Sequence, residues 1–191
     1  VYRTVIVAGA DRLPLANDSF GSVFANCSLE HMTHLPEVLS SIYCCLRPGG
    51  IFLLSVVTEK FLQWTTVPLL VAYIGDPERA AVLQAEHVSY HNLVNVLPPK
   101  SWIDYLATAG FEILEHIPIV PEITSHLFLL LDQLWHLQRP KRGELGEDLH
   151  NYLKLIPHFP RVFRDVYAGV LSMEQNWSIG SGAIFLARWS N

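Results

Sequence analysis

The chain has 191 residues, of which 50% are hydrophobic, and it carries a formal net charge of −5 at pH 7. A chain of this size and composition buries one substantial hydrophobic core, which excludes a disordered or fibrous protein. The acidic balance gives no broad attraction to phosphate backbones, so nucleic acid is not an expected partner.

Three cysteines, Cys27, Cys44 and Cys45, show no metal-ligand spacing, and the adjacent pair has poor geometry for a disulfide. This pattern favours a reducing compartment, so we expect a cytoplasmic location. The longest apolar stretches are too short or too interrupted to cross a bilayer, and no membrane span is predicted.

The first part of the chain predicts a strand, a helix and a strand. Residues 4–8 and 22–26 are apolar, β-branched runs typical of buried strands. A helix is expected from Thr33, with apolar residues at core spacing, until Pro48-Gly49-Gly50 stops it. The apolar run over 51–57 predicts a central strand covered on both faces. Short connections imply that the strands on either side of the helix pair in parallel.

Helical patterns dominate after residue 58. Segment 61–74 is apolar nearly all round, and Asp76-Pro77-Glu78 opens a helix that runs to about His87. The segment 88–97 is irregular. A helix over 99–109, ended by Gly110, leads into a strand over 111–119 that should supply core residues.

The last part of the chain holds three amphipathic helical patterns and one strand. Proline residues separate the helical patterns, and the final apolar run predicts a strand. The expected helices cover residues 122–137, 144–155 and 161–175, and the strand covers 182–189.

Four motifs follow one another along the chain in a characteristic order. They are Leu13-Pro14 with Asp18-Ser19-Phe20, then Leu29-Glu30-His31, then Leu46-Arg47-Pro48-Gly49-Gly50, and finally Ala109-Gly110-Phe111. In this order and spacing, the sequence resembles the class I S-adenosylmethionine-dependent methyltransferases of the ubiquinone-methyltransferase-like group. The resemblance covers residues 1 to about 58, 99–119 and 182–189.

The resemblance implies an α/β fold with a partial Rossmann-like sheet. The strands would be numbers 3 to 7 of the family's seven, the last one antiparallel, with an added helical cover. One incomplete domain is expected over residues 1–191, with helical insertions at about 59–98 and 121–176. The family's N-terminal glycine-rich cofactor motif is not present, because Val7-Ala8-Gly9-Ala10 has one glycine and no helical pattern after it. The two strands that accompany this motif normally lie between strands 4–8 and 22–26, so unpaired sheet edges are expected.

The cofactor implied by the resemblance is S-adenosylmethionine. Ligands of open α/β sheets lie beyond the carboxyl ends of the strands. By resemblance, Gly9, Ala10 and Asp11 would meet the adenine edge, while Asn26 and Cys27 would lie beside the adenine or methionyl part. Two positions depart from the family pattern, because Gly9 and Gly21 stand where acids are expected. Asp11 is the nearest substitute for the first of these acids.

Glu30 and His31 form a close acid and imidazole pair after a predicted strand. An imidazole titrates near neutrality, so His31 is a candidate general base for the methyl acceptor, with Glu30 orienting it or the substrate. The alternative is that the pair supports the loop, and the sequence leaves both roles open. The other histidines, among them His87, His91, His116, His126 and His136, are interpreted as solvated or packed residues, and no metal site is predicted.

Two functions remain open at this point. The first is the C-terminal portion of a methyltransferase that acts on a small hydrophobic molecule and is inactive as this fragment. The second is a noncatalytic methyltransferase remnant that pairs its exposed sheet edges with another chain or with itself, forming a homo-oligomer. The apolar side chains of segments 61–74 and 122–137 fit a substrate pocket, helix packing or a dimer surface.

Overall fold

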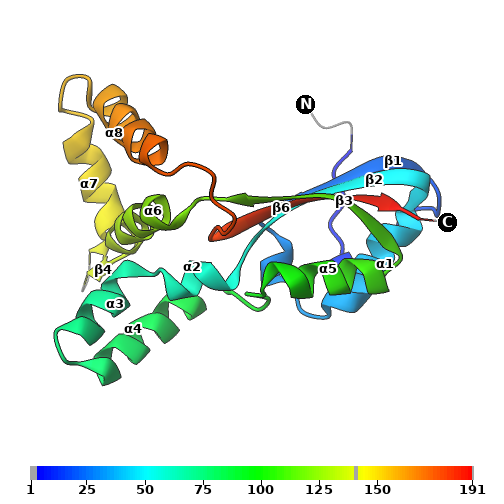
Figure 1. Cartoon of the computed structure of the whole chain (residues 1–191), viewed down its shortest axis with the longest axis horizontal. Coiled ribbons are helices and arrows are strands. Elements are labelled where there is room, and N and C mark those ends of the chain that lie inside the picture. Colours follow the sequence, from blue (N-terminus) through cyan, green and yellow to red (C-terminus); the bar gives the residue numbers. More distant parts are fainter. Residues whose placement is uncertain (1–3, 140–141, 191) are drawn as a thin grey trace. The chain divides into compact units, whose positions relative to one another are not determined.

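The computed structural model describes residues 4–139 and 142–190. The chain divides into two compact units. Unit 1 comprises Val1–Glu59, Asn92–Ile117 and Gly182–Asn191, and unit 2 comprises Lys60–His91 and Pro118–Ser181. Unit 1 holds the main sheet, whereas unit 2 is built mostly from helices (Figure 1). The single domain with two insertions stays a prediction.

The sheet of unit 1 is mixed and has the strand order β1-β2-β6-β3. Its strands are β1 (Phe20–Asn26), β2 (Leu46–Val57), β3 (Phe111–Ile119) and β6 (Gly182–Trp189). β1 and β2 pair in parallel, as predicted, and β6 runs antiparallel to β2. The predicted bounds of β3 and β6 agree with the structure.

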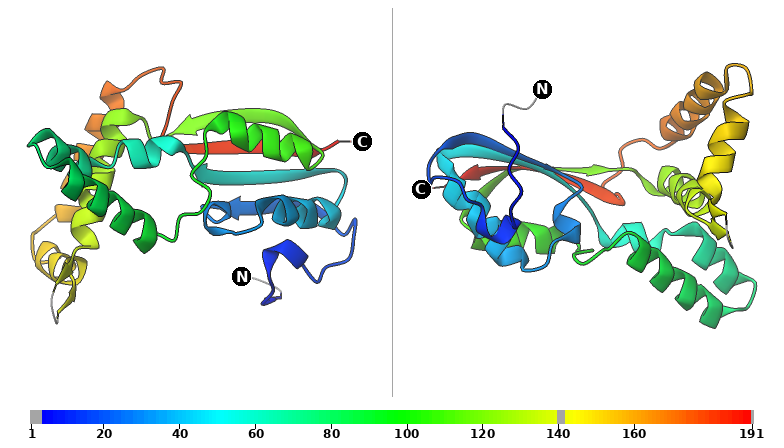
Figure 2. Two further views of the ribbon diagram at one scale, coloured as in Figure 1. Left: turned by 90° about the horizontal axis from the view of Figure 1, so that it is seen from below. Right: turned by 180° about the vertical axis from the view of Figure 1, so that it is seen from behind.

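Two helices, α1 (Leu35–Cys45) and α5 (Pro99–Thr108), cover one face of this sheet (Figures 1 and 2). Two 3₁₀ turns, η1 (Ala10–Arg12) and η2 (Leu29–His31), precede α1. Burying a large apolar side chain contributes about 1.5–3 kcal/mol, so the layer between helices and strands is the main source of stability in unit 1. The largest fully buried side chains of this core are Trp102, Phe52, Phe185, Leu29, Leu39, Leu46, Leu54, Leu106, Val38 and Val56.

Gly110 makes the connection from α5 to β3 possible. Its φ of +98° is a conformation that side-chain-bearing residues rarely adopt, and an added Cβ would lie 2.7 Å from Cε2 of Tyr43. The Tyr43 ring in turn stacks on Trp189, and its hydroxyl donates to the carbonyl of Ser190 at 3.1 Å. The Ala-Gly-Phe motif therefore has a packing role.

The predicted strand over residues 4–8 does not form. Residues 4–9 have no regular secondary structure, and the side chains of Val5 and Val7 are 80% and 99% exposed. A β-branched run becomes a strand only where a neighbouring strand offers hydrogen bonds, and the sheet of the described residues ends at β1. The strand expected over residues 4–8 is therefore absent from the described part of the sheet.

The prediction that 51–57 is covered on both faces holds only in part within unit 1, because some residues of this run are only partly buried. Phe24, Leu53 and Leu186 are aligned across three strands. Their neighbours along the strands, such as Phe52 and Phe185, belong to the core beside α1 and α5, so these three side chains lie on the opposite face. Phe24 is 67% exposed, and Leu53 and Leu186 are partly exposed. β3 supplies less core than expected, because Leu114 and Ile117 are each 42% exposed.

β1 and β2 both begin earlier in the chain than predicted. β1 is an exposed edge strand, so alternate side chains along it face solvent. β2 begins at Leu46, and the register shifts between Phe20 and Ser22 accommodate Pro48-Gly49-Gly50 in an irregular stretch of the ladder. α1 therefore ends at Cys45, before the predicted stop at Pro48-Gly49-Gly50, and this motif lies within β2.

Unit 2 contains α3 (Thr66–Tyr73), α4 (Pro77–Tyr90), α6 (Glu122–Trp135), α7 (Leu145–Leu153) and α8 (Phe159–Met173), after the short α2 (Glu59–Gln63). Its two-stranded sheet pairs β4 (Gln138–Arg139) with β5 (Gly143–Glu144). Helix α6 contacts α3, α7 and α8. The predicted cap of α4 is confirmed, because Oδ1 of Asp76 accepts from the backbone N–H of Arg79 at 2.9 Å.

Two of the helices predicted in this unit differ from the structure. The segment 61–74 is divided between α2 and α3, and α4 continues to Tyr90 instead of ending near His87. Among the described residues, no helix is both long enough and apolar enough to cross a membrane.

Candidate functional site

The carboxyl ends of β1 and β2 bring Asn26 and Cys27 together with Ser55. The hydroxyl of Ser55 donates to Oδ1 of Asn26 at 2.7 Å, and the backbone N–H of Cys27 donates to the carbonyl of Ser55 at 3.0 Å. Asn26 and Cys27 are exposed, while Ser55 is buried. Cys27 has φ of +42°, which turns the chain out of the sheet at this point. Two of the predicted cofactor residues therefore form a polar ledge fixed by Ser55.

Ser55 is absent from the sequence-based site. It stands opposite Asn26 in the parallel register, a relation that depends on how the two strands pair. A small polar residue within the otherwise apolar run 51–57 is the one signal in the sequence that points to it.

Glu30 is buried, with 1% of its surface exposed. Burial raises the pKa of its carboxyl group, although hydrogen bonds from its own backbone and from Val57, the nearby His31 and a hydrogen bond from Cys27 act in the opposite direction. Its Oε2 has no hydrogen-bond partner among the described residues. A carboxyl group in this setting favours the neutral form more than an exposed one does.

The side chain of His31 differs from Glu30 in being exposed. Its Nδ1 lies 3.3 Å from the carbonyl oxygen of Asn92. The two neighbours in the motif thus have different environments, one internal and one accessible to a substrate. Their catalytic roles stay predictions.

Gly9, Ala10 and Asp11 lie elsewhere in unit 1, in and beside the η1 turn. η1 packs against α1, and the backbone N–H of Leu13 donates to the hydroxyl of Ser41 at 2.9 Å. The open hollow beside η1 is lined by residues of the η1 region and α1, without Asn26 or Cys27. In the described part of unit 1, Asp11 therefore lines a hollow that Asn26 and Cys27 do not line. The roles of these five residues in binding a cofactor stay predictions.

Asn95 holds the Leu-Glu-His turn in place, which the sequence did not predict. Its Nδ2 donates to the carbonyl oxygens of Leu29 and Met32, at 2.8 and 2.6 Å. The backbone N–H groups of Val94 and Asn95 both donate to the carbonyl of Glu30. The irregular segment after α4 is thus a clasp on η2, in the sense that its hydrogen bonds hold this turn in place.

Replacing Asn95 with Ala should lower the free energy of unfolding of unit 1 by about 1–3 kcal/mol, because two partly buried carbonyl groups lose their donor. Asn95→Asp should cost more, since a carboxylate would face the same two carbonyl oxygens. Denaturant unfolding, together with amide exchange at residues 29–32, measures both variants. Equal stability of Asn95→Asp and the unaltered chain would contradict the clasp.

The sheet and the polar ledge of unit 1 define a class of protein. A mixed α/β sheet with a polar ledge at the carboxyl ends of its parallel strands is typical of ligand-binding α/β proteins. Two solved structures share this fold. The [4+2]-cyclase SpnF matches with a TM-score of 0.52 and 18% identity, over 96% of this chain and 54% of that one. Phosphoethanolamine N-methyltransferase 2 of Haemonchus contortus, in complex with phosphomonomethylethanolamine and S-adenosylhomocysteine, matches with a TM-score of 0.52 and 18% identity, over 97% of this chain and 37% of that one.

The sequence comparisons assign the family. The profile of a family described as a methyltransferase domain matches residues 9–116, more than half of the chain. The chain belongs to this methyltransferase family, and the class I S-adenosylmethionine-dependent type predicted from the four motifs is confirmed. The ubiquinone/menaquinone biosynthesis C-methyltransferase UbiE of Brucella suis is 26% identical over 119 residues, which are 56% of this chain and 42% of that protein. The chain thus spans about half the length of the relatives it matches.

Proposed function

We propose that this chain supplies the C-terminal portion of an S-adenosylmethionine-dependent methyltransferase, with Asn26 and Cys27 on the cofactor side of the site and Glu30 and His31 on the acceptor side. The polar ledge at the carboxyl ends of β1 and β2 carries this proposal, because ligands of open α/β sheets bind at that edge. In this assignment the four main strands are numbers 4, 5, 7 and 6 of the family's sheet, in their spatial order.

Two features of unit 1 support an incomplete cofactor site. β1 is an edge strand in the described part of the sheet, on the side where the family's remaining strands would pair. The row of Phe24, Leu53 and Leu186 leaves an apolar face uncovered within the unit, whereas family members carry helices on both faces. Both features correspond to the strands and helices that accompany a glycine-rich cofactor motif.

Methyl transfer makes modest chemical demands on the protein. S-adenosylmethionine supplies an activated methyl group, so the protein has to orient donor and acceptor and exclude water. Asn26, held by Ser55, is suited to positioning a polar ligand, and the exposed His31 is suited to taking a proton from an acceptor. Glu30, being buried, is assigned the support of this loop.

A hydrophobic substrate is supported by one hollow in unit 2. Its lining comes from α6 and α8 and is almost entirely apolar, which is typical of small-molecule sites. The residues concerned are Phe128, Leu131, Asp132, Trp135, His136, Phe163 and Tyr167.

Titration of S-adenosylhomocysteine into the chain by calorimetry tests the proposal. The 191 residues alone should show no saturation in the micromolar range, whereas a longer protein that includes residues encoded upstream should bind with micromolar affinity. In that longer protein, Asn26→Ala should weaken binding by about tenfold or more, the loss of one hydrogen bond to a ligand. Asn151→Ala, an exposed position in unit 2, is the control. Micromolar binding by the 191-residue chain would defeat the assignment as an incomplete site.

The noncatalytic remnant is the second candidate, and the exposed edge of β1 favours it. Phe20 and Phe24 of this strand are 39% and 67% exposed, and unpaired strand edges template pairing with other chains. This function predicts a stable oligomer by light scattering and no cofactor binding after upstream residues are restored. A monomer that gains cofactor affinity with those residues would exclude it. The cytoplasmic location stays a prediction in either case.

A further inference from the structure

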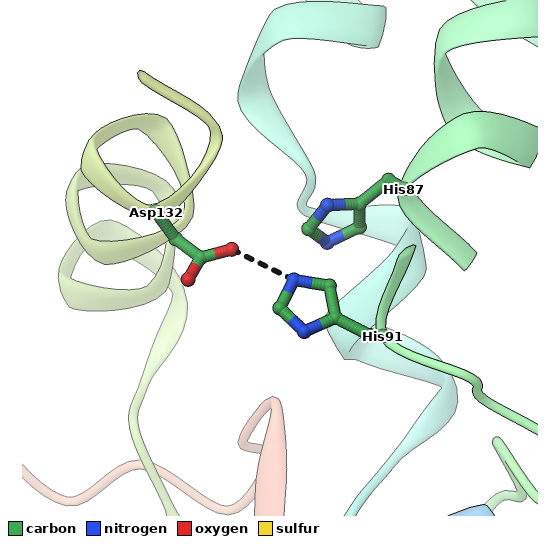
Figure 3. Close-up of side chains that lie close together, drawn as sticks. All are labelled: His87, His91 and Asp132. Atoms are coloured by element: carbon green, nitrogen blue, oxygen red, sulfur yellow. Dashed lines mark hydrogen bonds and ion pairs between the residues drawn. The ribbon is translucent and has the colours of Figure 1, made fainter. Parts of the chain in front are cut away.

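A cluster of two histidines and an aspartate joins α4 to α6 in unit 2 (Figure 3). His87 lies in the last turn of α4 and His91 is its C-cap, four residues later, so both side chains share one face of the helix. Asp132 comes from α6. One ligand atom from each residue lies within 4.8 Å of the others, and Nε2 of His91 is 3.0 Å from Oδ2 of Asp132.

His87 is the member of the cluster whose burial is not explained by hydrogen bonds. Its surface is 7% exposed, and its Nε2 has no hydrogen-bond partner among the described residues. Leaving a buried polar atom unpaired costs about 1–3 kcal/mol. The ring is nevertheless held in place, stacked on Phe61 with centroids 5.5 Å apart and edge-on to His91 at 4.5 Å. A fixed, buried and unpaired imidazole nitrogen beside a carboxylate is the arrangement that a bound cation satisfies.

A second layer of polar groups orients the carboxylate. Nε2 of His136 lies 3.5 Å from Oδ1 of Asp132, and Nδ1 of His136 lies 3.2 Å from Oε2 of Glu144. The hydroxyl of Tyr90 donates to Oε1 of the same Glu144 at 2.7 Å. Outer groups of this kind fix the direction of metal ligands in known sites.

We propose that His87, His91 and Asp132 bind a divalent transition-metal ion of the zinc type, with a water molecule as fourth ligand. Two imidazoles and one carboxylate suit zinc, whereas calcium and magnesium prefer all-oxygen sites. Zinc sits about 2.0–2.2 Å from such ligands, so small side-chain rotations bring the three donor atoms to the required separation. His91 and Asp132, with side chains 22% and 15% exposed, leave a route for the ion.

The site would have a structural consequence that is independent of methyl transfer. α4 belongs to the segment Lys60–His91 and α6 to the segment Pro118–Ser181, so the ion would cross-link the two parts of unit 2. Ions that bind only the folded state stabilise it by mass action. His87 and His91 are four residues apart on a helix, and this spacing is a sequence signal for the site. The interpretation of each histidine as a separate packed residue does not use this signal.

The test is the addition of Zn²⁺ or Co²⁺ to the chelator-treated 191-residue chain. One equivalent should bind, the thermal midpoint should rise, and the Co²⁺ absorption should be that of a nitrogen and oxygen site without thiolate charge transfer. Asp132→Asn, which keeps the shape of the side chain, should weaken binding by about 100-fold, the upper end of the roughly 10–100-fold range seen when a metal site loses even an outer supporting group. His150→Ala, which removes an exposed histidine of the same unit, should bind as the unaltered chain does.

NMR of the histidine rings gives a reading that does not depend on a variant folding. Sub-stoichiometric Co²⁺ should broaden the signals of His87 and His91 before those of His150 and His158. The proposal is overturned by an absence of binding, by full affinity in Asp132→Asn when its circular dichroism is native, or by thiolate charge transfer that assigns the ion to Cys44 or another cysteine.

Discussion

Replacing Trp102 with Ala should lower the free energy of unfolding of unit 1 by about 3–5 kcal/mol, the range for large aromatic residues removed from a packed core. Trp102 is 0% exposed and belongs to the cluster that joins α5 to the sheet through Phe52, Leu54 and Phe111. The remaining cavity cannot collapse easily, because the backbone around it is held in a sheet and a helix. Amide exchange in β2 and β6 measures the loss where it is expected.

The control for this prediction is one helical turn away. Tyr105→Ala removes an aromatic ring from the same helix at a position that is 38% exposed, so its cost should be well below that of Trp102→Ala. Because the polar ledge depends on the pairing of β1 with β2, the Trp102 variant should also loosen Asn26 and Cys27. A similar loss in both variants would show that the cost does not depend on the burial of the Trp102 ring.

Acidification should destabilise unit 2 between pH 6.5 and about 4, measured without metal. Burial, followed by the positive charge of His91, lowers the pKa of His87 from 6.5 to about 4, with His136 acting in the same direction and Asp132 in the opposite one. The unfolded chain therefore takes up a proton at this imidazole below pH 6.5, while the folded chain does so only near pH 4. Stability is fully present above pH 6.5, and roughly 3 kcal/mol of it is lost as the pH falls through this window.

Asp132 adds to this loss at lower pH. Burial acts to raise the pKa of Asp132, but the hydrogen bond from His91 and the charges of the neighbouring imidazoles outweigh it and hold this pKa below its usual value. The favourable ion pairs of a carboxylate with lowered pKa are present at neutral pH and are lost as it becomes protonated. The two groups therefore act in the same direction.

His87→Gln tests the assignment to this imidazole. Amide exchange in α4 and α6, followed from pH 4 to pH 7, should show a marked loss of protection towards acid in the unaltered chain and a much flatter profile in the variant. The buried position makes the effect large, since His87 is only 7% exposed and its charged form loses most of its hydration in the folded state. An unchanged pH profile in His87→Gln would show that groups other than His87 cause the acid sensitivity.

Local patterns in the sequence determine much of the fold. The strands over 111–119 and 182–189 were predicted with the bounds they have in the structure, and the parallel pairing of β1 and β2 followed from the short connections around α1. The Asp76 cap and the break at Gly110 were equally readable. Each of these depends on residues close together in sequence or on general rules of chain connection.

The errors have a common physical origin in missing neighbours. Residues 4–8 have the composition of a strand, yet they stay irregular and exposed because no strand of the described sheet pairs with them. The run over 51–57 is apolar enough for two covered faces, although helices of unit 1 cover only one. A hydrophobic pattern indicates that a segment can bury apolar side chains. It does not indicate whether another strand or helix is present to cover them.

The sequence by itself determined the family, because Leu29-Glu30-His31 and the other three motifs are short, ordered and independent of tertiary contacts. Only the tertiary structure decided that Glu30 is buried while the adjacent His31 is exposed, and that Ser55 and Asn95 hold the site residues. It also decided that Asp11 lines a hollow with residues of α1 while Asn26 is held by Ser55, and that Asp132 meets two histidines more than forty positions earlier in the chain. The reason is that burial, hydrogen bonding and coordination arise between residues distant in sequence, whereas motifs record only what lies next to what along the chain.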